Sequence, residues 1–453
     1  MFDLIIKGGC LVGIDGTTLG TIGIKSNKIV LISKDEGNLS AKEVIDASGK
    51  LIFPGMIDCH VHLNEPGFEW REDILHGTRS AAAGGITTII DMPLQNTPSP
   101  ITAENFRAKA RLLNDKAYVD FALWGGFIDN NLGHLNDLYG QGAASLKVFL
   151  GPVSSDYSPL DLGLLRAGLQ QAAKLGIRIG IHCEDISIIR QEESNAQKEG
   201  RNNIADYLNS RPVIAEILAV TNVIELAKET KAKVHICHVS HPDVAEVIKK
   251  AKAAGLDVTA ETCSHYLIFN DDIFKEKGPL FKCAPPIRSE KEREQLWAYV
   301  LDGTLDCLAS DHSPCAPAEK EKGLSDIWQA WTGISGLQTT FQIMFNEMYH
   351  KRKLNPALLA KVLSYNPSRV FGLYPRKGAL RLGSDADLVI VNPETPWNVE
   401  SGDLFYKNPI SAFVGTQGKG IVEKTIIRGE IVFDQGIFKV NEGFGIFINP
   451  RMM

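Results

Sequence analysis

The stretch Gly55-Met-Ile-Asp-Cys-His-Val-His-Leu-Asn-Glu-Pro-Gly67 decides how the rest of the chain is interpreted. Its first half is an apolar run that ends in His60 and His62, and its second half breaks at the turn signal Pro66-Gly67. Side chains two apart on a strand point to the same side, so both imidazoles would project together from the strand end. Such a pair suits a transition metal. Taken alone, it fits an ordinary surface or core histidine pair equally well.

The bulk composition is that of a soluble globular protein with at least two structural units. The chain has 453 residues, of which 44% are hydrophobic and 23% charged, and it exceeds the size at which one core stops growing. A net charge of −6 argues against a nucleic-acid or anionic membrane partner. No secretory start or membrane-spanning apolar run is visible, and the eight cysteines include no C-x-x-C pair. We therefore expect a cytoplasmic protein with reduced thiols.

Both ends of the chain contain short strand patterns separated by turn residues, which predicts one shared β-rich domain. We assign residues 1–53 and 378–453 to this composite, sandwich-like domain. The expected strands are Asp3–Lys7, Cys10–Val12, Thr21–Ile24, Ile29–Ser33, Val44–Asp46, Ala386–Asn392, Lys424–Arg428 and Glu430–Phe433.

The middle of the chain, residues 54–377, alternates strand and helix patterns. Eight such repeats predict an α/β fold, a (β/α)₈ TIM barrel with functional groups at the carboxyl ends of its strands. The expected strands are Gly55–His62, Thr87–Pro93, Tyr118–Phe127, Ala144–Leu150, Ile177–Glu184, Lys233–Ser240, Asp257–Tyr266 and Asp306–Pro314. The expected helices are Arg71–Ala83, Ile101–Leu113, Leu160–Leu175, Pro212–Thr230, Pro242–Ala254, Ile327–Tyr349 and one that begins at Ala357–Ser364 and ends near Asn366-Pro367.

Six side chains with metal-binding or titratable groups lie late in these expected strands. They are His60, His62, Lys147, His182, His238 and Asp311. A barrel would gather all six at one mouth, and chance placement of so many such groups at strand ends is improbable. The sequence therefore predicts a metal centre there.

Lys147 is the informative member, because it stands inside the otherwise apolar strand Ala144–Leu150. Burial disfavours an ammonium, and a neutral amine can take up CO₂ to form a carbamate with two oxygens. We predict that His60 and His62 hold one divalent metal, that His182 and His238 hold a second, and that carboxylated Lys147 bridges them. Asp311 would bind the first metal and transfer protons, while the paired metals lower the pKa of a bridging water. The alternatives are a snorkelling or ion-paired lysine and histidines that serve only in the core.

Other histidines are expected outside the ligand set. His235 is three residues from His238, so on a strand it would face the opposite way and be structural. His241 and His265 lie near strand ends, where they would either support the ligands or be polar loop residues, and we favour polar loop residues. His312 follows Asp311 and would either orient it or bond a neighbouring loop.

A family resemblance rests on motifs along nearly the whole chain. Pro54-Gly-Met-Ile-Asp-Cys-His-Val-His62, Gly84-Gly-Ile-Thr-Thr88, Leu146-Lys-Val-Phe149, His182-Cys-Glu184, His238-Val-Ser240 and Ser310-Asp-His-Ser-Pro314 resemble those of cyclic amidohydrolases, the group of dihydroorotases, hydantoinases and allantoinases. This resemblance implies a binuclear metal centre, a carboxylated lysine and hydrolysis of a ring amide. The implied ligands match at the six positions already identified.

The departures from the dihydroorotase pattern indicate a neutral substrate. Asn64 stands where an arginine usually clamps a substrate carboxylate, and Met92-Pro-Leu-Gln95 and Lys282-Cys-Ala-Pro-Pro-Ile-Arg288 also differ. Without that arginine, an anionic substrate is a poor match. With Asp306–Cys315 and Trp331–Gln338, these motifs resemble allantoinases most closely, which implies opening of the hydantoin ring of allantoin. Substrate contacts are expected near Asn64, Cys283, Ala284 and Ser313.

Two alternatives stay open, namely a hydantoinase-like or dihydroorotase-like cyclic amidase and a metal-free scaffold relative. The intact ligand set argues against the scaffold. Imidazole and carboxylate ligands suit zinc, expected first, and also cobalt, manganese, iron or nickel. Family analogy implies a homotetramer acting on a small cyclic ureide. The sequence specifies neither the native metal nor the stereochemical preference.

Overall fold

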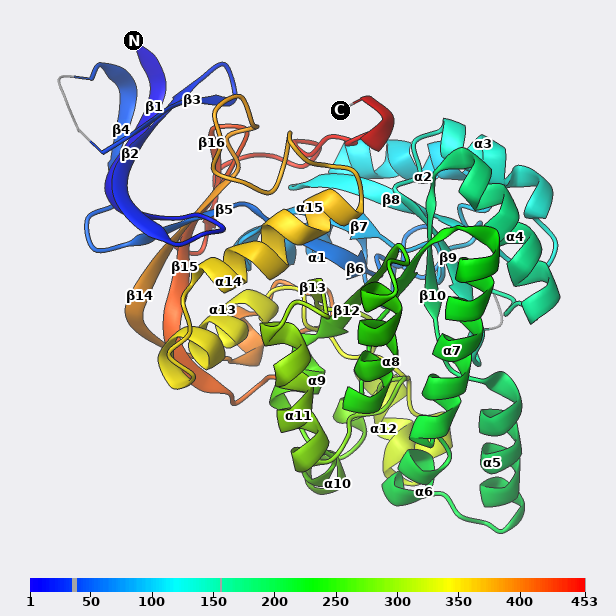
Figure 1. The fold of residues 1–453 in the computed structure, drawn as a ribbon. Coiled ribbons are helices and arrows are strands. Elements are labelled where there is room, and N and C mark those ends of the chain that lie inside the picture. Colours follow the sequence, from blue (N-terminus) through cyan, green and yellow to red (C-terminus); the bar gives the residue numbers. More distant parts are fainter. Residues whose placement is uncertain (35–38, 155–156, 453) are drawn as a thin grey trace.

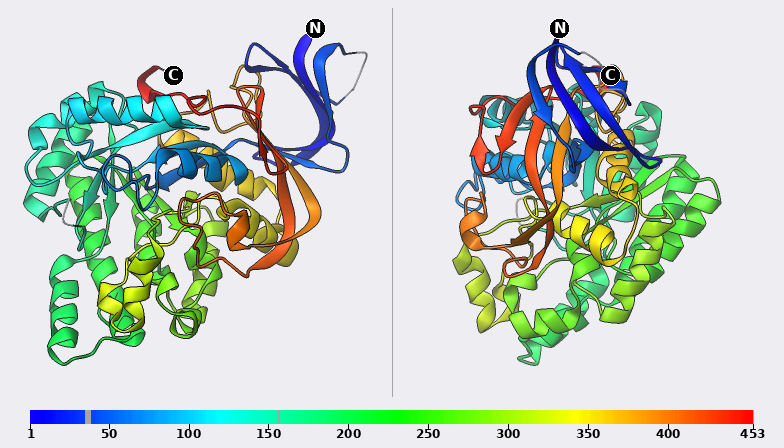
Figure 2. Two further views of the ribbon diagram at one scale, coloured as in Figure 1. Left: turned by 180° about the vertical axis from the view of Figure 1, so that it is seen from behind. Right: turned by 90° about the vertical axis from the view of Figure 1, so that its left-hand side faces the viewer.

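The computed structural model describes residues 1–34, 39–154 and 157–452, and its strands form two sheets (Figure 1). One sheet curls into a barrel surrounded by helices, and the other stands beside it and contains both ends of the chain. The blue amino-terminal strands and the orange carboxy-terminal strands lie side by side in this second sheet, as the two views of Figure 2 also show.

The barrel sheet has eight parallel strands in chain order, as the alternating pattern predicts. Val61 pairs with His312 beyond the last strand, where the His62 amide donates to the His312 carbonyl at 2.9 Å, and this contact brings the first and last strands together. The strands are β6 Met56–Val61, β7 Ile86–Asp91, β8 Asp120–Gly126, β9 Ser145–Phe149, β10 Arg178–His182, β11 Lys233–Ile236, β12 Val258–Cys263 and β13 Cys307–Ala309.

Helices cover the outside of the barrel, and capping residues mark where they begin and end. In α4, Leu162–Leu175, the Asp161 side chain accepts from the Leu164 amide, and Gly176 ends the helix with a positive φ of 72°. Its buried positions recur at helical spacing and pack toward the strands. The other α-helices before the end of the barrel are α1 Ile74–Ala83, α2 Ala103–Lys116, α3 Leu135–Gly140, α5 Ile186–Lys198, α6 Ile204–Asn209, α7 Val213–Thr230, α8 Pro242–Ala253, α9 Ser264–Ile268, α10 Asp271–Lys277, α11 Glu290–Leu301 and α12 Pro317–Glu321.

The predicted helix Ile327–Tyr349 is wrong over its first half. A short 3₁₀ turn, η4 Ile327–Gln329, leads into an extended segment, and helix begins only at α13, Thr340–Phe345, which continues as the π-helix η5, Asn346–Lys351. Ile334 pairs with His312, so the segment lies against the barrel mouth. Two glycines in Thr332–Gln338 weaken the helical preference, and pairing with the barrel outweighs what remains of it.

The last predicted helix also runs further than expected. α14 Ala357–Ala360 passes through a π-turn, η6 Lys361–Tyr365, into α15 Asn366–Val370. Pro367 lies in the first turn of α15, directly after the π-turn, and the helix continues through it to Val370.

The second sheet has nine strands and confirms that the chain ends fold together. Its central contact joins β5 to β14 antiparallel, so an amino-terminal strand lies directly beside a carboxy-terminal one. The strands are β1 Phe2–Val12, β2 Thr17–Lys25, β3 Lys28–Ser33, β4 Ala41–Asp46, β5 Leu51–Pro54, β14 Leu388–Asn398, β15 Gln417–Ile427, β16 Glu430–Asp434 and β17 Ile437–Phe438. The segment after β17 returns to the barrel, where Phe447 pairs with Phe121 of β8. The domain limits at 53/54 and 377/378 stay predictions.

Among the helices of the described residues, none has both the length and the apolar character needed to cross a bilayer.

Candidate metal centre

The six predicted ligands lie at the carboxyl ends of five barrel strands and are all buried. His60 and His62 come from the end of β6, Lys147 from β9, His182 from β10, His238 from just after β11, and Asp311 from just after β13. Each has at most 9% of its surface exposed. The barrel therefore brings together groups that are up to 251 positions apart, from His60 to Asp311, in the sequence.

Interatomic distances divide the four histidines and Asp311 into two neighbouring subgroups. The Nε2 atoms of His60 and His62 each lie 3.3 Å from Asp311 Oδ1. On the other side, His182 Nδ1 lies 3.0 Å from His238 Nε2. The rings of His60 and His238 are 5.3 Å apart, centre to centre, so the two subgroups are neighbours.

Lys147 is fully buried beside these two subgroups. Its Nζ lies 3.1 Å from Cys237 Sγ and 4.9 Å from the centre of the Phe149 ring. Among the described residues, no carboxylate oxygen lies within 4.0 Å of this nitrogen. The lysine therefore neither reaches solvent nor forms the ion pair that would explain a buried ammonium.

The donor set fits divalent cations. Four imidazoles and one carboxylate converge, and the side-chain Nδ1 atoms of His62 and His238 have no hydrogen-bond partner. Burial lowers the pKa of His60 to about 4 and holds that of His238 well below its ordinary value. The His60 and His238 rings are thus neutral, as metal ligation requires. His60, His62 and Asp311 alone place three ligand atoms within 4.8 Å of one another.

A cavity of about 360 Å³ opens onto this cluster. Its wall includes four of the predicted ligand histidines together with Asp311, and Lys147 lies behind them. Of the predicted substrate contacts, Cys283, Ala284 and Ser313 line the cavity. Asn64 does not; it is fully buried and donates through Nδ2 to Gln95 Oε1 at 2.9 Å, and Gln95 does line the cavity.

Of the remaining histidines, His241 and His312 follow expectation, whereas His265 and His235 do not. His241 caps α8 by accepting from the Asp243 amide, and His312 Nδ1 accepts from the Gly336 amide at 3.2 Å, so it bonds a neighbouring loop. His265 is buried within the Cys263, His265 and Asp311 group, and neither ring nitrogen has a partner. It is therefore not the polar loop residue that the sequence suggested.

The expectation that His235 faces away from His238 is wrong. His235 points into the barrel, where its Nε2 donates to Glu261 Oε2 at 3.0 Å. Strand β11 ends at Ile236, and His238 takes a positive φ of 37°, so strand alternation stops before His238. Both histidines consequently reach the interior, although His235 contacts Glu261 and Thr259 and not the ligand cluster.

Comparison with known proteins identifies the family to which this arrangement belongs. The amidohydrolase family profile matches residues 51–432. The chain belongs to the amidohydrolase family. It is 40% identical over 452 residues to an allantoinase of Rubrobacter xylanophilus, which covers 99% of this chain and 98% of that protein. It is 36% identical to an allantoinase of Escherichia coli O139:H28, over 98% of this chain and 97% of the relative.

Solved structures agree with the fold of this amidohydrolase. The L-hydantoinase (dihydropyrimidinase) of Arthrobacter aurescens superposes with a TM-score of 0.97 at 34% identity, covering 99% of this chain and all of the other. The dihydropyrimidinase of Brevibacillus agri superposes with a TM-score of 0.92 at 28% identity, over 98% of both chains. The protein is thus an enzyme with the barrel that its sequence predicts.

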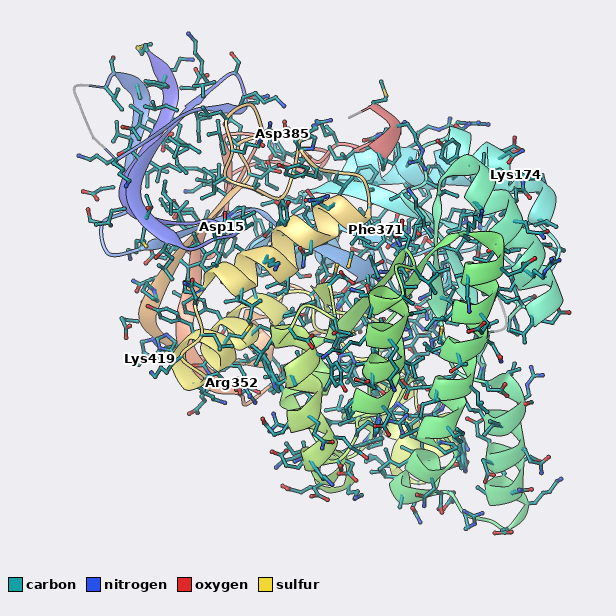
Figure 3. All side chains as sticks on the ribbon, in the orientation of Figure 1. Asp15, Lys174, Arg352, Phe371, Asp385 and Lys419 are labelled. Atoms are coloured by element: carbon teal, nitrogen blue, oxygen red, sulfur yellow. The ribbon has the colours of Figure 1, made fainter. Side chains whose placement is uncertain are left out.

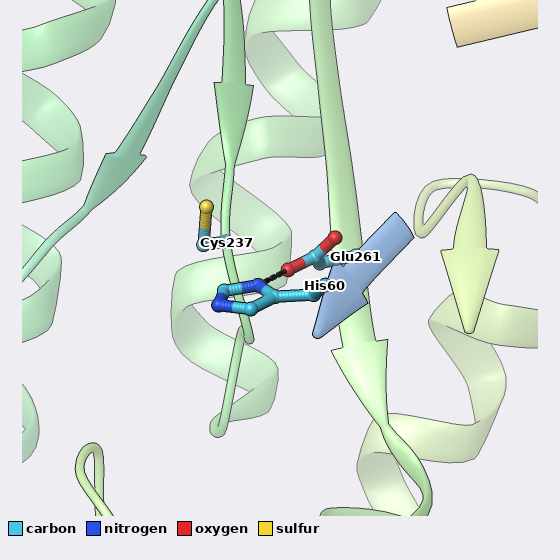
Figure 4. Close-up of side chains that lie close together, drawn as sticks. All are labelled: His60, Cys237 and Glu261. Carbon is cyan, nitrogen blue, oxygen red and sulfur yellow. Dashed lines mark hydrogen bonds and ion pairs between the residues drawn. The ribbon is translucent and has the colours of Figure 1, made fainter. Parts of the chain in front are cut away.

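Glu261, which was not predicted from the sequence, is a buried acidic residue that contacts His60 on the side of the ring away from Asp311. Glu261 of β12 contacts His60 Nδ1 through Oε1, and Figure 4 shows this pair beside Cys237. Its second oxygen, Oε2, contacts His235 and accepts from Cys59 Sγ at 3.3 Å. Burial opposes ionisation of Glu261, but His60 and His235 hold its pKa well below the ordinary range. A lone glutamate in the apolar strand Val258–Cys263 was the available signal.

Two further acids contact the predicted ligands of this amidohydrolase. Asp58 Oδ1 accepts from the amides of His60 and Ser310, each at 3.2 Å, and so joins the ends of β6 and β13. Glu184 Oε2 lies 2.7 Å from His182 Nε2 and accepts from Arg211 at 2.6 Å. Burial raises the pKa of Glu184, but Arg211 and His182 overcome this effect and lower it to about 2. The ionised carboxylate fixes His182 with Nδ1 turned toward His238.

Proposed function

We propose that this amidohydrolase is an allantoinase, which opens the hydantoin ring of allantoin to give allantoate in purine and ureide catabolism. The observation that carries the proposal is the convergence of five buried metal-binding groups on one cavity, with Lys147 buried in the neighbouring strand β9, in a chain similar over nearly its whole length to allantoinases. The hydantoinase neighbours support hydrolysis of a neutral cyclic amide as the chemistry.

A neutral substrate agrees with the charges of the cavity wall. Asn64 stands at the position where a carboxylate-binding arginine was expected for an anionic ring, and its side chain is engaged by Gln95. Arg211 is the buried guanidinium in the wall, and it is paired with Glu184 at 2.6 Å and with Glu193 at 3.2 Å. The charge of Arg211 is thus compensated within the protein, so this guanidinium offers little attraction for a substrate anion.

The cofactor in this proposal is a pair of divalent cations, zinc first. His60, His62 and Asp311 would hold one, His182 and His238 the other, and the carbamate formed by CO₂ on Lys147 would bridge them. When bound, such a pair supplies Lewis acidity and a water of lowered pKa.

The protein groups then move the proton and exclude solvent. Asp311 is placed at the cavity wall, where its carboxylate would take the proton of the attacking water. As the carbonyl carbon gains an oxygen, the ring C–N bond breaks, and Asp311 returns the proton to the departing nitrogen. Cys283, Ala284 and Ser313 also line the cavity and would contact the ring.

A substrate panel tests this function. Purified, metal-loaded protein is offered allantoin, hydantoin, dihydrouracil and dihydroorotate, and ring opening is followed by chromatography; an Asp311→Asn variant controls for contaminating hydrolases. We expect kcat/KM for allantoin to exceed the others by about a hundredfold or more, within the range that polar recognition can provide. Preference for dihydroorotate or for hydantoin would replace our proposal with one of the two alternative cyclic amidases.

Assembly and location belong to the same proposal. We infer a cytoplasmic homotetramer without nucleic-acid or membrane partners, on the strength of family analogy and of the net charge of −6. Light scattering of the purified enzyme would give the mass directly.

A further inference from the structure

One wall of the cavity is an irregular segment, residues 327–333, which we term the wall loop. It begins with η4 and contributes Gln329, Ala330, Trp331, Thr332 and Gly333 to the cavity surface. Little regular structure supports it, yet Trp331 donates through Nε1 to the Ser313 carbonyl at 3.2 Å and so approaches the metal centre. Something other than helix or sheet must hold its backbone in place.

Lys282 provides the first hold. It follows the turn η2, Pro279–Phe281, and only 3% of its surface is exposed. Its Nζ donates to the carbonyls of Ile327 and Ala330, both at 2.8 Å, and approaches that of Trp328 at 3.4 Å. The Lys282 amino group thus satisfies three backbone carbonyls of the wall loop, as a capping group does at a helix end. These bonds fix the curvature of the loop.

Lys320 of α12 provides the second hold, from the other side. It is 5% exposed, and its Nζ donates to the carbonyl of Trp331 at 3.0 Å and to that of Lys282 itself at 3.1 Å. The Lys282 carbonyl also accepts from the Gly333 amide at 2.9 Å. The two lysines and the wall loop therefore form one connected hydrogen-bond network.

This network joins the wall loop to the adjoining wall of the substrate cavity. Lys282 is followed directly by Cys283 and Ala284, both of which line the cavity. The Cys283 carbonyl accepts from Tyr207 at 2.8 Å, and the Tyr207 ring lies 4.8 Å from Lys282 Nζ. A displacement of Lys282 would thus shift both walls, although neither lysine lies among the metal-binding groups.

We propose that Lys282 and Lys320 are paired positioning residues that clamp the wall loop and thereby set the affinity of the cavity for its substrate. The clamp itself is independent of the reaction, and only the choice of allantoin as the assay substrate rests on the proposed function. Neither residue touches the reacting atoms. Their loss should weaken substrate binding far more than the chemical step.

The two amino groups also give the clamp a dependence on pH. Burial lowers the pKa of Lys282 to about 7, with a contribution from Arg211, and lowers that of Lys320 to about 8. An ammonium donates three hydrogen bonds and a neutral amine two, so neutral Lys282 loses one of its three acceptors. Both lysines also lose the charge that strengthens their remaining bonds, so the network weakens as pH rises through this window. The charged or titratable groups that face the pair are Arg211, Glu193 and Asp326 around Lys282, and Cys315, Cys283 and Glu319 around Lys320.

The test replaces the lysines with methionine, which keeps the length of the side chain and removes the donors. Lys282→Met, Lys320→Met and the double variant are compared with Lys277→Met, a control at an exposed lysine of α10. Hydrogen exchange of the wall loop amides, metal content, kcat and KM are measured for each. We expect at least tenfold faster exchange at Trp331 and Gly333, a tenfold or greater rise in KM, kcat within threefold, and unchanged metal content.

Two further readouts keep the proposal falsifiable. The effects of the single variants should be non-additive, because both lysines act on one loop. KM of the wild type should rise between pH 7 and 9, and this rise should be absent from the double variant. Unchanged loop exchange with unchanged KM would overturn the clamp, as would a parallel loss of metal and kcat. Failure of wild type to open allantoin would refute the proposed function alone, because the exchange measurement needs no substrate.

Discussion

At the scale of single residues, the site depends on acids that the ligand motifs do not contain. His60 faces the cavity through Nε2 because Glu261 holds Nδ1, and Glu261 is itself held by His235 and Cys59. Such carboxylate–histidine contacts fix the ring and raise its basicity toward a metal. The proposed ligands could be selected from their positions in or after the barrel strands. The supporting acids left a weaker signal, a single acidic residue inside a strand pattern, which does not show which histidine the acid contacts.

Glu261→Gln tests this support. The amide keeps the size of the side chain but removes the negative charge next to His60 and His235. We expect metal affinity to fall about ten- to a hundredfold, measured by competition with a chromogenic chelator. Glu225→Gln, at an exposed position of α7, should leave affinity unchanged. Equal affinity in the two variants would mean that Glu261 has only a structural role.

The error about His235 and His238 has a similar origin. Alternation along a strand predicts opposite faces only while the strand continues, and β11 ends at Ile236. The left-handed backbone of His238, at φ 37°, re-aims its side chain toward His182. The sequence contains no glycine or proline at this point that would have indicated the break.

At the scale of elements, the barrel strands were easier to predict than the loops that connect them. Parallel strands buried on both faces are nearly continuous apolar runs, so all eight were visible. The segment Thr332–Gln338, which comes after β13, was not predictable, because it gains its conformation from pairing with His312 and from contact with Ser313. Long-range contacts of this kind leave no local pattern.

Gly333→Ala tests the close packing of that segment. A β-carbon at Gly333 would lie 2.5 Å from the Ser313 carbonyl oxygen, so the wall loop would have to move. We expect kcat/KM to fall about ten- to a hundredfold, mainly through KM, since small displacements of positioning groups are costly. Gly133→Ala is the matched control, because its added carbon meets no atom within 4 Å. Wild-type kinetics for Gly333→Ala would show that the loop tolerates displacement.

At the scale of the whole molecule, a buried ion network joins the two sheets. Lys377 is fully buried and lies 2.6 Å from carboxylate oxygens of Asp120, at the start of β8, and of Asp387, just before β14. It also lies 3.0 Å from Asp385, which is labelled in Figure 3. Arg428 of the second sheet contacts Asp120 as well. The shared core of the chain ends was predictable from their strand patterns, whereas this charged junction was not.

Lys377→Met should destabilise the enzyme strongly. It leaves Asp120 and Asp387 buried without their common cation, and removal of one partner of a buried pair costs about 3–5 kcal/mol. We expect a marked fall in the urea midpoint and in Tm. Lys174→Met, at the exposed lysine labelled in Figure 3, is the control and should behave as wild type. A change below about 1 kcal/mol would mean that the carboxylates become protonated at little cost.

The central claim is that six distant side chains hold two cations and that Lys147 bridges them as a carbamate. Elemental analysis of Lys147→Ala beside wild type, each with and without propionate, tests it most directly. We expect two metal ions per wild-type chain, at most one in Lys147→Ala together with loss of allantoin hydrolysis, and partial recovery of both when a short carboxylate fills the vacated position. Two ions and full turnover in Lys147→Ala without propionate would contradict the account.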